Sequence, residues 1–162
     1  MNSKKILGGA LLLAVACHGP EPSPLLRGNT YTGWRGPVGA DAAHWTLRDG
    51  RLSCEGPAGP IWTEKEYGDC EITLDVRLIE GRPTAVLRAR GERGFQLELE
   101  PKPTGEWSHI QARFVGDNMD VDVDGQPSAG RLPDVERVGA IGLAVEGSGS
   151  LELARIGVRK LP

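Results

Sequence analysis

The sequence lacks helical signals. In its 162 residues, no segment repeats apolar side chains at the i, i+3, i+4 and i+7 spacing of an amphipathic helix over three turns. Glycine and proline are frequent instead, with 23 and 12 copies, and they separate short runs in which apolar and polar residues alternate. Such alternation is typical of β-strands that bury one face. These observations exclude an all-helical fold and predict an all-β protein.

The chain also lacks a strong charge of either sign and the usual metal-binding patterns. Its formal net charge is −3 at pH 7, and loss of Lys4 and Lys5 with an N-terminal signal shifts it to −5. A mildly acidic domain is a poor partner for nucleic-acid phosphates, so we expect no nucleic-acid ligand. No C-x-x-C pair and no Cys/His cluster is present. We therefore expect no metal and no cofactor.

The one long apolar run lies at the N-terminus. Lys4 and Lys5 precede the apolar segment 6–16, which is too short to cross a bilayer and is organised like a secretory signal. It ends in the sequence A-V-A-C at Cys17, which resembles a bacterial lipoprotein signal, in which the cysteine is lipidated. We therefore expect residues 1–16 to be a signal peptide, and a lipid anchor on Cys17 to hold the protein in the cell envelope, on the periplasmic face or the cell surface. The alternative is ordinary cleavage nearby that leaves Cys17 unmodified.

The rest of the chain predicts one domain on a short tether. Residues 17–24 are rich in proline and show no apolar periodicity, so we expect an extended tether. Residues 25–162 have the length of a single domain with one core.

Two further cysteines, Cys54 and Cys70, would lie outside the reducing cytosol. They are candidates for a disulfide, which would stabilise the fold by about 3 kcal/mol in the chain-entropy model. The alternative is a pair of buried thiols, because Cys70 stands where a core side chain would fit.

The clearest strand signal runs from Cys70 to Leu78. Its apolar side chains alternate with Thr73, Asp75 and Arg77, so these three polar residues share one face of the strand. Further alternating or apolar runs lie at residues 45–47, 61–63, 84–90, 95–99, 107–115, 119–123, 138–145 and 151–158. Some ten short strands, each with one apolar face, must stack as two sheets around one core.

Turn signals divide these runs. The pair Asp49-Gly50 predicts a hairpin between two short strands. Residues 64–69 are predicted to be a polar connection, and residues 147–149, with sequence G-S-G, a turn between the last two strands.

Short landmarks follow one another in a fixed order from Leu25 to Leu161. They are Gly33-Trp34-Arg35, Trp45 with Asp49-Gly50, Trp62-Thr63, Tyr67-Gly68-Asp69, Glu71 to Arg77, Leu87-Arg88, Gly94-Phe95, Gly105-Glu106-Trp107, Val123-Asp124-Gly125 and Gly139 to Leu143. In this order they resemble the 3-keto-disaccharide hydrolase domain family. The resemblance implies a jelly-roll β-sandwich of two antiparallel sheets, of the concanavalin A-like type, and hydrolysis or lyase-type cleavage of 3-keto-glycosides.

Candidate catalytic residues come from the polar positions of this pattern. Arg88, Gln96 and Glu98 fall at the polar positions of the family, where a carboxylate would do acid–base work and an arginine would hold a hydroxyl or keto oxygen. His109 is a further candidate acid or base, because histidine titrates near neutral pH. The alternative for His109 is a surface residue of a strand.

Candidate ligand-binding residues are Trp34, Asp75, Arg77 and Arg90. Trp34 lies in a glycine loop, where its ring would be available to stack on a sugar. If the strands that carry Asp75, Arg88 and Glu98 are neighbours, their polar faces meet on one side of a sheet. The alternative is a set of cross-strand ion pairs on a solvated sheet, with the tryptophans in the core.

Two functions remain open. The first is a carbohydrate-active hydrolase or lyase that acts on keto-glycosides. The second is a non-catalytic glycan-binding or interaction module of an envelope lipoprotein. Two differences from the family favour the second function: Arg82-Pro83-Thr84 stands where the family usually has Asn-Ser-Gly, and Gln96-Leu97-Glu98 reverses the usual order of Glu and Gln.

Overall fold

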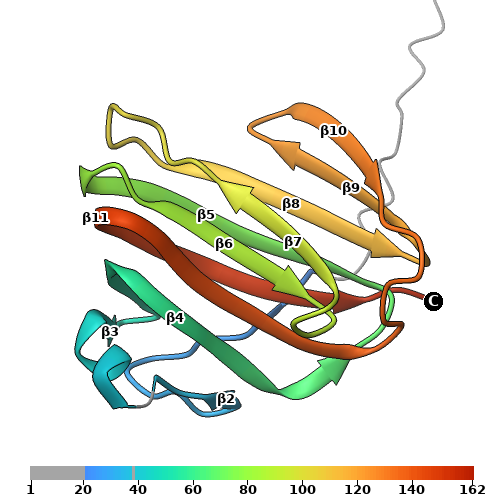
Figure 1. Cartoon of the computed structure of the whole chain (residues 1–162), viewed down its shortest axis with the longest axis horizontal. Helices are drawn as coiled ribbons and strands as arrows, with labels where there is room; N and C mark the ends of the chain where they lie inside the picture. The colour runs from blue at the N-terminus through green and yellow to red at the C-terminus, as the bar shows by residue number, and fades with distance from the viewer. Residues whose placement is uncertain (1–20, 38) are drawn as a thin grey trace, which may run out of the picture.

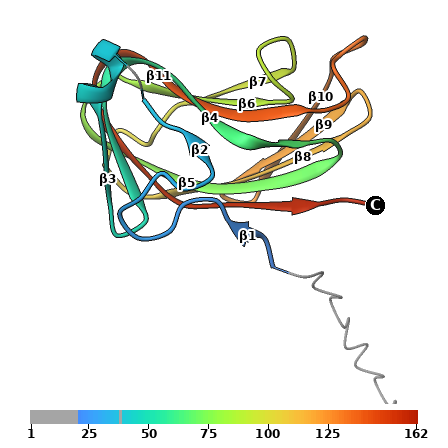
Figure 2. The same cartoon turned by 90° about the horizontal axis from the view of Figure 1, so that it is seen from below.

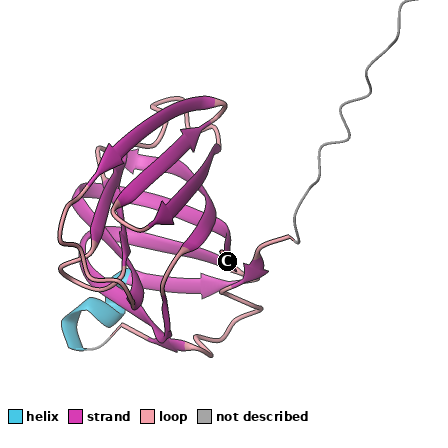
Figure 3. Cartoon of the chain, turned by 90° about the vertical axis from the view of Figure 1, so that its right-hand side faces the viewer, coloured by secondary structure: helices cyan, strands magenta, loops and turns pink. Residues whose placement is uncertain are grey.

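The computed structural model describes residues 21–37 and 39–162, which are almost entirely β-structure (Figure 3). The predicted signal peptide and Cys17 lie outside these residues. The described strands are β1 (Ser23–Pro24), β2 (Trp34–Arg35), β3 (Trp45–Arg48), β4 (Arg51–Tyr67), β5 (Cys70–Gly81), β6 (Thr84–Ala89), β7 (Phe95–Leu99), β8 (Ser108–Val115), β9 (Asn118–Val123), β10 (Gln126–Arg131) and β11 (Gly139–Lys160). A short 3-10 helix, η1 (Gly39–His44), precedes β3. No helix among the described residues is long and apolar enough to cross a membrane.

Two antiparallel sheets stack face to face (Figures 1 and 2). The β5–β8 sheet contains β10, β9, β8, β5, the second half of β11 and the first half of β4, with β3 at its edge. The β6–β7 sheet contains β7, β6, the first half of β11, the second half of β4 and β2. All of these pairings are antiparallel, so the predicted pair of antiparallel sheets is confirmed.

The long strands β4 and β11 take part in both sheets. They span 17 and 22 residues, and they bend together where their register shifts, between Val145 and Gly149. At Gly149 the backbone has φ of +129°, and a Cβ atom there would lie 2.1 Å from the carbonyl oxygen of Glu80. The turn predicted at residues 147–149 is therefore wrong: the glycines bend a single strand across the edge of the sandwich.

The polar connection predicted at residues 64–69 is also mostly strand. β4 continues to Tyr67 because Tyr67 and Glu66 pair with Gly139 and Ala140 of β11. The partner strand thus overrides the polar composition of this segment. The hairpin predicted at Asp49-Gly50 is confirmed, since β3 and β4 pair on either side of it.

The core lies between the sheets and is built by the alternation seen in the sequence. Ile72, Leu74 and Val76 of β5 are at most 1% exposed. From the other sheet, Leu87 of β6 and Phe95 of β7 reach the same core. Complete burial of a side chain of this size contributes about 2 kcal/mol, so the alternating strands account for the stacking of the two sheets.

The candidate disulfide between Cys54 and Cys70 does not form, and the alternative of two buried thiols is confirmed. Cys54 and Cys70 are buried in the core and are not bonded to each other. The register places Cys54 opposite Leu151, which in turn pairs with Leu78, eight residues along β5 from Cys70. That separation is about 26 Å at the rise of a strand, whereas the Cα atoms of a disulfide lie within about 7 Å. Burial also raises the pKa of the Cys70 thiol to about 11.

The N-terminal segment joins the β5–β8 sheet before the predicted domain boundary. Ser23 and Pro24 pair with Val158 and Gly157 of β11. The sandwich therefore takes in two residues that the sequence pattern assigns to the tether.

Candidate functional site

The predicted polar face does not form, because its strands lie in different sheets. β5 pairs with β8 and β11, whereas β6 pairs with β7 and with the other half of β11. Asp75 and Arg77 on β5 therefore face the opposite side of the molecule from Arg88 and Glu98. The chain crosses from one sheet to the other at Arg82-Pro83 instead of forming a hairpin within one sheet. The candidate residues thus divide between two outer faces.

The outer face of the β6–β7 sheet carries a row of side chains that crosses five strands. In register order, the row consists of Gln96, Arg88, Gly142, Trp62 and Arg35. Two residues further along β7, Glu98 pairs with Val86 of β6, which in turn pairs with Ala144 of β11. We call the surface formed by Gln96, Glu98, Arg88, Val86, Gly142, Ala144 and Trp62 the Trp62 face. It has small residues in the middle, an aromatic ring on one side and polar groups on the other.

The ring of Trp62 lies against the backbone of Gly142. A Cβ atom at Gly142 would come 2.6 Å from Cζ3 and 2.7 Å from Cε3 of Trp62, so only glycine leaves room for the ring. Trp62 is partly exposed although it is a large aromatic residue. The glycine therefore holds the ring across the sheet while part of the indole stays accessible to a ligand.

Arg88 brings an unpartnered donor to the Trp62 face. Its Nε atom is buried and forms no hydrogen bond. Glu98 lies diagonally across from Arg88 on the edge strand β7, and no ion pair links these two side chains or engages either of them among the described residues. A buried donor without a partner costs about 1–3 kcal/mol, so this guanidinium has hydrogen-bonding capacity to offer a ligand.

The outer face of the β5–β8 sheet is a ladder of ion pairs. Arg77 of β5 lies 2.6 Å from Glu152 of β11, and Arg159 lies 2.8 Å from Glu71. The guanidinium of Arg77 also stacks on Trp107, 4.7 Å from the ring centroid. For this face, the interpretation as cross-strand ion pairs is confirmed.

One cluster in this ladder joins two predicted site residues. His109 Nδ1 lies 2.7 Å from Asp75 Oδ1, and Arg155 Nε donates to Asp75 Oδ2. Asp75 is only 4% exposed, whereas the side chains of His109 and Arg155 are 53% and 75% exposed. Arg155 has a positive φ of 48° at a register shift of β11, a bulge that points its side chain at Asp75.

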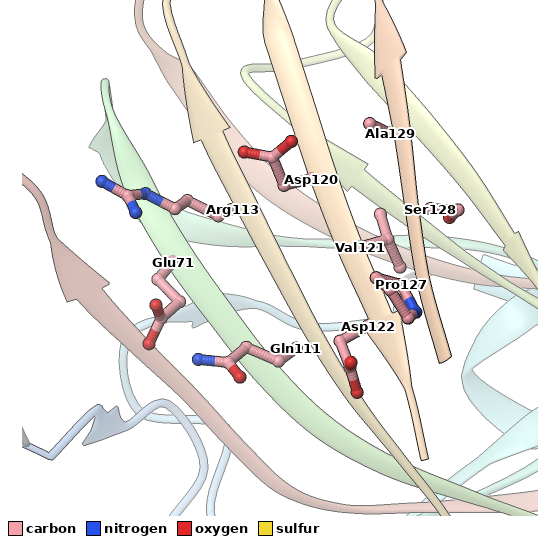
Figure 4. A pocket seen from close by; sticks show the side chains of 9 residues that line it. All are labelled: Glu71, Gln111, Arg113, Asp120, Val121, Asp122, Pro127, Ser128 and Ala129. Atoms are coloured by element: carbon pink, nitrogen blue, oxygen red, sulfur yellow. The ribbon is translucent and has the colours of Figure 1, made fainter. Parts of the chain in front are cut away.

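A polar cavity lies beyond this cluster on the same face. It measures about 530 Å³ and is lined by polar side chains of β5, β8 and β9, with β10 as its far wall (Figure 4). Glu71, Arg113 and Asp120 follow one another across three strands, so opposite charges alternate there. No aromatic side chain lines this cavity. It thus offers no platform for stacking on a sugar ring.

The prediction that Trp34 and Arg90 bind a ligand is wrong, because both side chains are buried. Trp34 is 4% exposed, and its Nε1 donates to the carbonyl oxygen of Leu25 at 2.7 Å. Arg90 is 1% exposed; its guanidinium pairs with Asp69 at 2.7 Å and stacks on Phe95. Neither side chain can reach a ligand at the surface.

Any of the four tryptophans could stack on a sugar, and the glycine loop around Trp34 favours Trp34 over Trp62 in the sequence. The structure reverses this preference, because Trp34 is buried and Trp62 is partly exposed. The alternation within β4 was the available signal: Ile61 and Thr63 are buried, so Trp62 between them must face outward.

The side chains that commonly bind metals do not cluster in the part of the chain that the structure describes. No set of three or more His, Cys, Asp or Glu side chains there is arranged to hold a metal ion.

Comparison with known proteins identifies the fold. No family model and no curated protein matches the sequence. A provisionally assigned glycosyl hydrolase of Parabacteroides distasonis superposes with a TM-score of 0.67 at 16% identity, over 85% of this chain and 93% of that protein. A β-glucanase of Bacillus licheniformis does so with a TM-score of 0.62 at 10% identity, over 90% of this chain and all of that one.

A carbohydrate-binding module of Bacillus subtilis has the same architecture. Its TM-score is 0.60 at 12% identity, over 79% of this chain and 96% of that module. Identities this low establish the fold and no more. The expected jelly-roll β-sandwich of the concanavalin A-like type is therefore confirmed.

Proposed function

We propose that this protein is a carbohydrate-active envelope protein that binds a glycan on the Trp62 face. One observation carries the proposal: the ring of Trp62 lies over Gly142 and remains partly exposed beside Arg88 and Gln96. Sugars bind proteins by stacking their apolar C–H faces on aromatic rings while polar side chains take the hydroxyl groups. On the Trp62 face these two elements lie side by side, whereas on the opposite face the ring of Trp107 stacks on the guanidinium of Arg77, which is itself paired with Glu152.

The proposal predicts that binding depends on Trp62 and on its glycine support. On an array of neutral and acidic glycans, the wild type should bind at least one glycan. Trp62→Ala should raise the dissociation constant for that glycan at least about tenfold, a loss of about 1.4 kcal/mol in binding free energy. Gly142→Ala should weaken binding too, because the added methyl group displaces the ring. Isothermal titration with the best array ligand gives the constants.

Trp107→Ala is the matched control for Trp62→Ala. Trp107 is also a partly exposed tryptophan, but it stacks on Arg77 at the other face. Trp107→Ala should leave affinity unchanged, and circular dichroism should show that all variants are folded. Equal affinity of the wild type and Trp62→Ala would contradict the proposal.

Cleavage of a 3-keto-glycoside at the same face is the second candidate function. Elimination from such a sugar needs one base to take the proton from C2 and one cation to hold the keto oxygen as it gains negative charge. The C1–O bond then breaks, and the departing sugar takes up a proton. Glu98 and the unpartnered guanidinium of Arg88 supply that base and that cation.

Sugar release from 3-keto-glycosides tests this second function. If the protein cleaves them, Glu98→Gln should lower the rate at least about a hundredfold, and Arg88→Ala should lower it as well. Both variants should still bind the glycan if Trp62 supplies most of the affinity. If the wild type is as inert as Glu98→Gln, the protein binds carbohydrate without cleaving it.

We also propose that lipidation of Cys17 places the protein in the cell envelope. The A-V-A-C sequence at the end of the apolar segment supports this location. Labelled palmitate should be incorporated in the wild type, and globomycin should block its processing. Palmitate incorporation that persists in Cys17→Ser, or none in the wild type, would contradict the anchor.

A further inference from the structure

The N-terminal segment lies across the outer face of the β5–β8 sheet. A Cβ atom at Gly157 would lie 3.1 Å from Cβ of Pro22 and 3.2 Å from Oγ1 of Thr73, so Pro22 packs on this face. A cavity of about 410 Å³ there is lined by Glu21 and Pro22 together with Thr73, His109, Arg155 and neighbouring residues of β11. The residues that line this cavity with the N-terminal segment come from three strands, β5, β8 and β11. The described chain thus begins beside β11, with Glu21 and Pro22 on the outer face of this sheet and far from the edge strand β10 (Figure 2).

Very little chain separates this point from the proposed anchor. Four residue steps lead from Cys17 to Glu21, and a fully extended chain covers at most about 14 Å in four steps. Prolines at positions 20, 22 and 24 favour a stiff, extended tether over a flexible one. If lipid on Cys17 is inserted in the bilayer, Glu21, on the outer face of the β5–β8 sheet, must lie within about 15 Å of the lipid headgroups.

We propose that the anchor seats the outer face of the β5–β8 sheet against the phospholipid headgroups and turns the Trp62 face away from the membrane. The inference rests on the proposed lipidation of Cys17. The two sheets stack about 10 Å apart, so the thickness of the sandwich separates the Trp62 face from the membrane. The ligand is then a carbohydrate that approaches from the aqueous side, and a glycolipid headgroup of the same leaflet is excluded.

The charges on the proposed membrane-facing surface indicate that the lipid anchor, and not electrostatic attraction, holds the protein at the membrane. Exposed Arg113 and Arg155 are balanced there by Asp120 and by the partly exposed Asp122. A surface of mixed sign gains little from anionic lipids. Association of the lipidated protein with vesicles should therefore be the same at low and at high salt.

Two exposed glutamines on opposite faces provide a matched pair of probe sites. Gln111 lies on β8 at the proposed membrane side, and Gln96 lies on β7 at the Trp62 face. Full-length lipoprotein carrying Gln111→Cys or Gln96→Cys is labelled with a fluorophore. It is then inserted into phosphatidylethanolamine–phosphatidylglycerol vesicles that contain headgroup-nitroxide lipids. Cys54 and Cys70 are buried, so the wild type serves as the labelling blank.

The expected result is at least about threefold stronger quenching at position 111 than at position 96. An insertion of 20 Gly/Ser residues before Glu21 has a root-mean-square span of about 25 Å and should abolish the difference. Equal quenching in the parent protein would overturn the orientation. If the difference in quenching between positions 111 and 96 persists after the insertion, the short tether is not its cause. Neither result affects glycan binding measured on an array, so failure of this inference is distinguishable from failure of the proposed function.

Discussion

Arg90 shows at the scale of one residue how a polar position in a strand pattern can belong to the interior. It follows the last residue of β6 with a positive φ of 66°, so its side chain leaves the alternation and enters the molecule. Its guanidinium donates to the carbonyl oxygen of Gly116 at 2.6 Å and to Asp69 Oδ1 at 2.7 Å. The backbone N–H of Gly116 donates to the same Asp69 oxygen. Arg90 thus ties the β4–β5 turn to the β8–β9 turn.

This role predicts a large effect on stability. Arg90→Met should lower the free energy of unfolding by about 3 kcal/mol, because the carbonyl oxygens of Gly68, Gly116 and Glu136 and the carboxylate of Asp69 each lose a donor. Arg93→Met is the control: Arg93 pairs with Glu136 but its side chain is 87% exposed, and the expected cost is below about 1 kcal/mol. Urea denaturation measures both, and equal costs would contradict the role of Arg90.

Individual residues also mark the limit of what the sequence predicts. The alternation in β5 gives the core positions Ile72, Leu74 and Val76 correctly, because a period of two needs no partner to be recognised. It does not give the partners of the polar residues in between. Asp75 is buried only because His109 and Arg155 cover it from other strands, and one of these lies at a bulge.

At the scale of elements, β4 and β11 are the strands that make the sandwich. Each begins in one sheet and ends in the other, so the sheets are joined through continuous hydrogen bonding. Glycine signals alone cannot separate a hairpin turn from a bend within a strand, since both need positive φ. That is why residues 147–149 predict a turn and instead form the bend of β11.

The bend predicts a specific intolerance at Gly149. In Gly149→Ala, the methyl group would meet the backbone of Glu80 at 2.1 Å and adopt a φ of +129°. We expect a loss of at least about 3 kcal/mol in unfolding free energy, the sum of strain and overpacking. Gly125→Ala is the matched control, because Gly125 also has a positive φ, +82°, but nothing within 4 Å of the added atom. In thermal denaturation, the melting temperature of Gly149→Ala should lie well below that of Gly125→Ala. The reverse order would contradict this description of the bend.

The pairing of elements also explains why the predicted site was divided. β5, β6 and β7 follow one another in the sequence, and neighbours in sequence are commonly neighbours in a sheet. Here the step at Arg82-Pro83 changes sheets, and β11, which lies far along the chain, separates β5 from β6. No local pattern in residues 79–84 distinguishes that step from a hairpin.

The whole molecule has two outer faces of different character. One is crossed by ion pairs and receives the N-terminal segment, and the other carries Trp62, Arg88 and Glu98 around a floor of small residues. Proteins that share this fold include a carbohydrate-binding module and a β-glucanase, although the fold does not transfer their functions. We propose that the outer face of the β5–β8 sheet lies against the membrane and that the Trp62 face binds the glycan.

The indole N–H signals of the four tryptophans test glycan binding at the Trp62 face most directly. In ¹H–¹⁵N spectra of the protein titrated with its best array ligand, the signal of Trp62 should shift progressively to saturation. The signals of Trp107, on the opposite face, and of buried Trp34 and Trp45 should stay in place. A shift of Trp107 without Trp62, or no shift of any indole at saturating ligand, would contradict glycan binding at the Trp62 face.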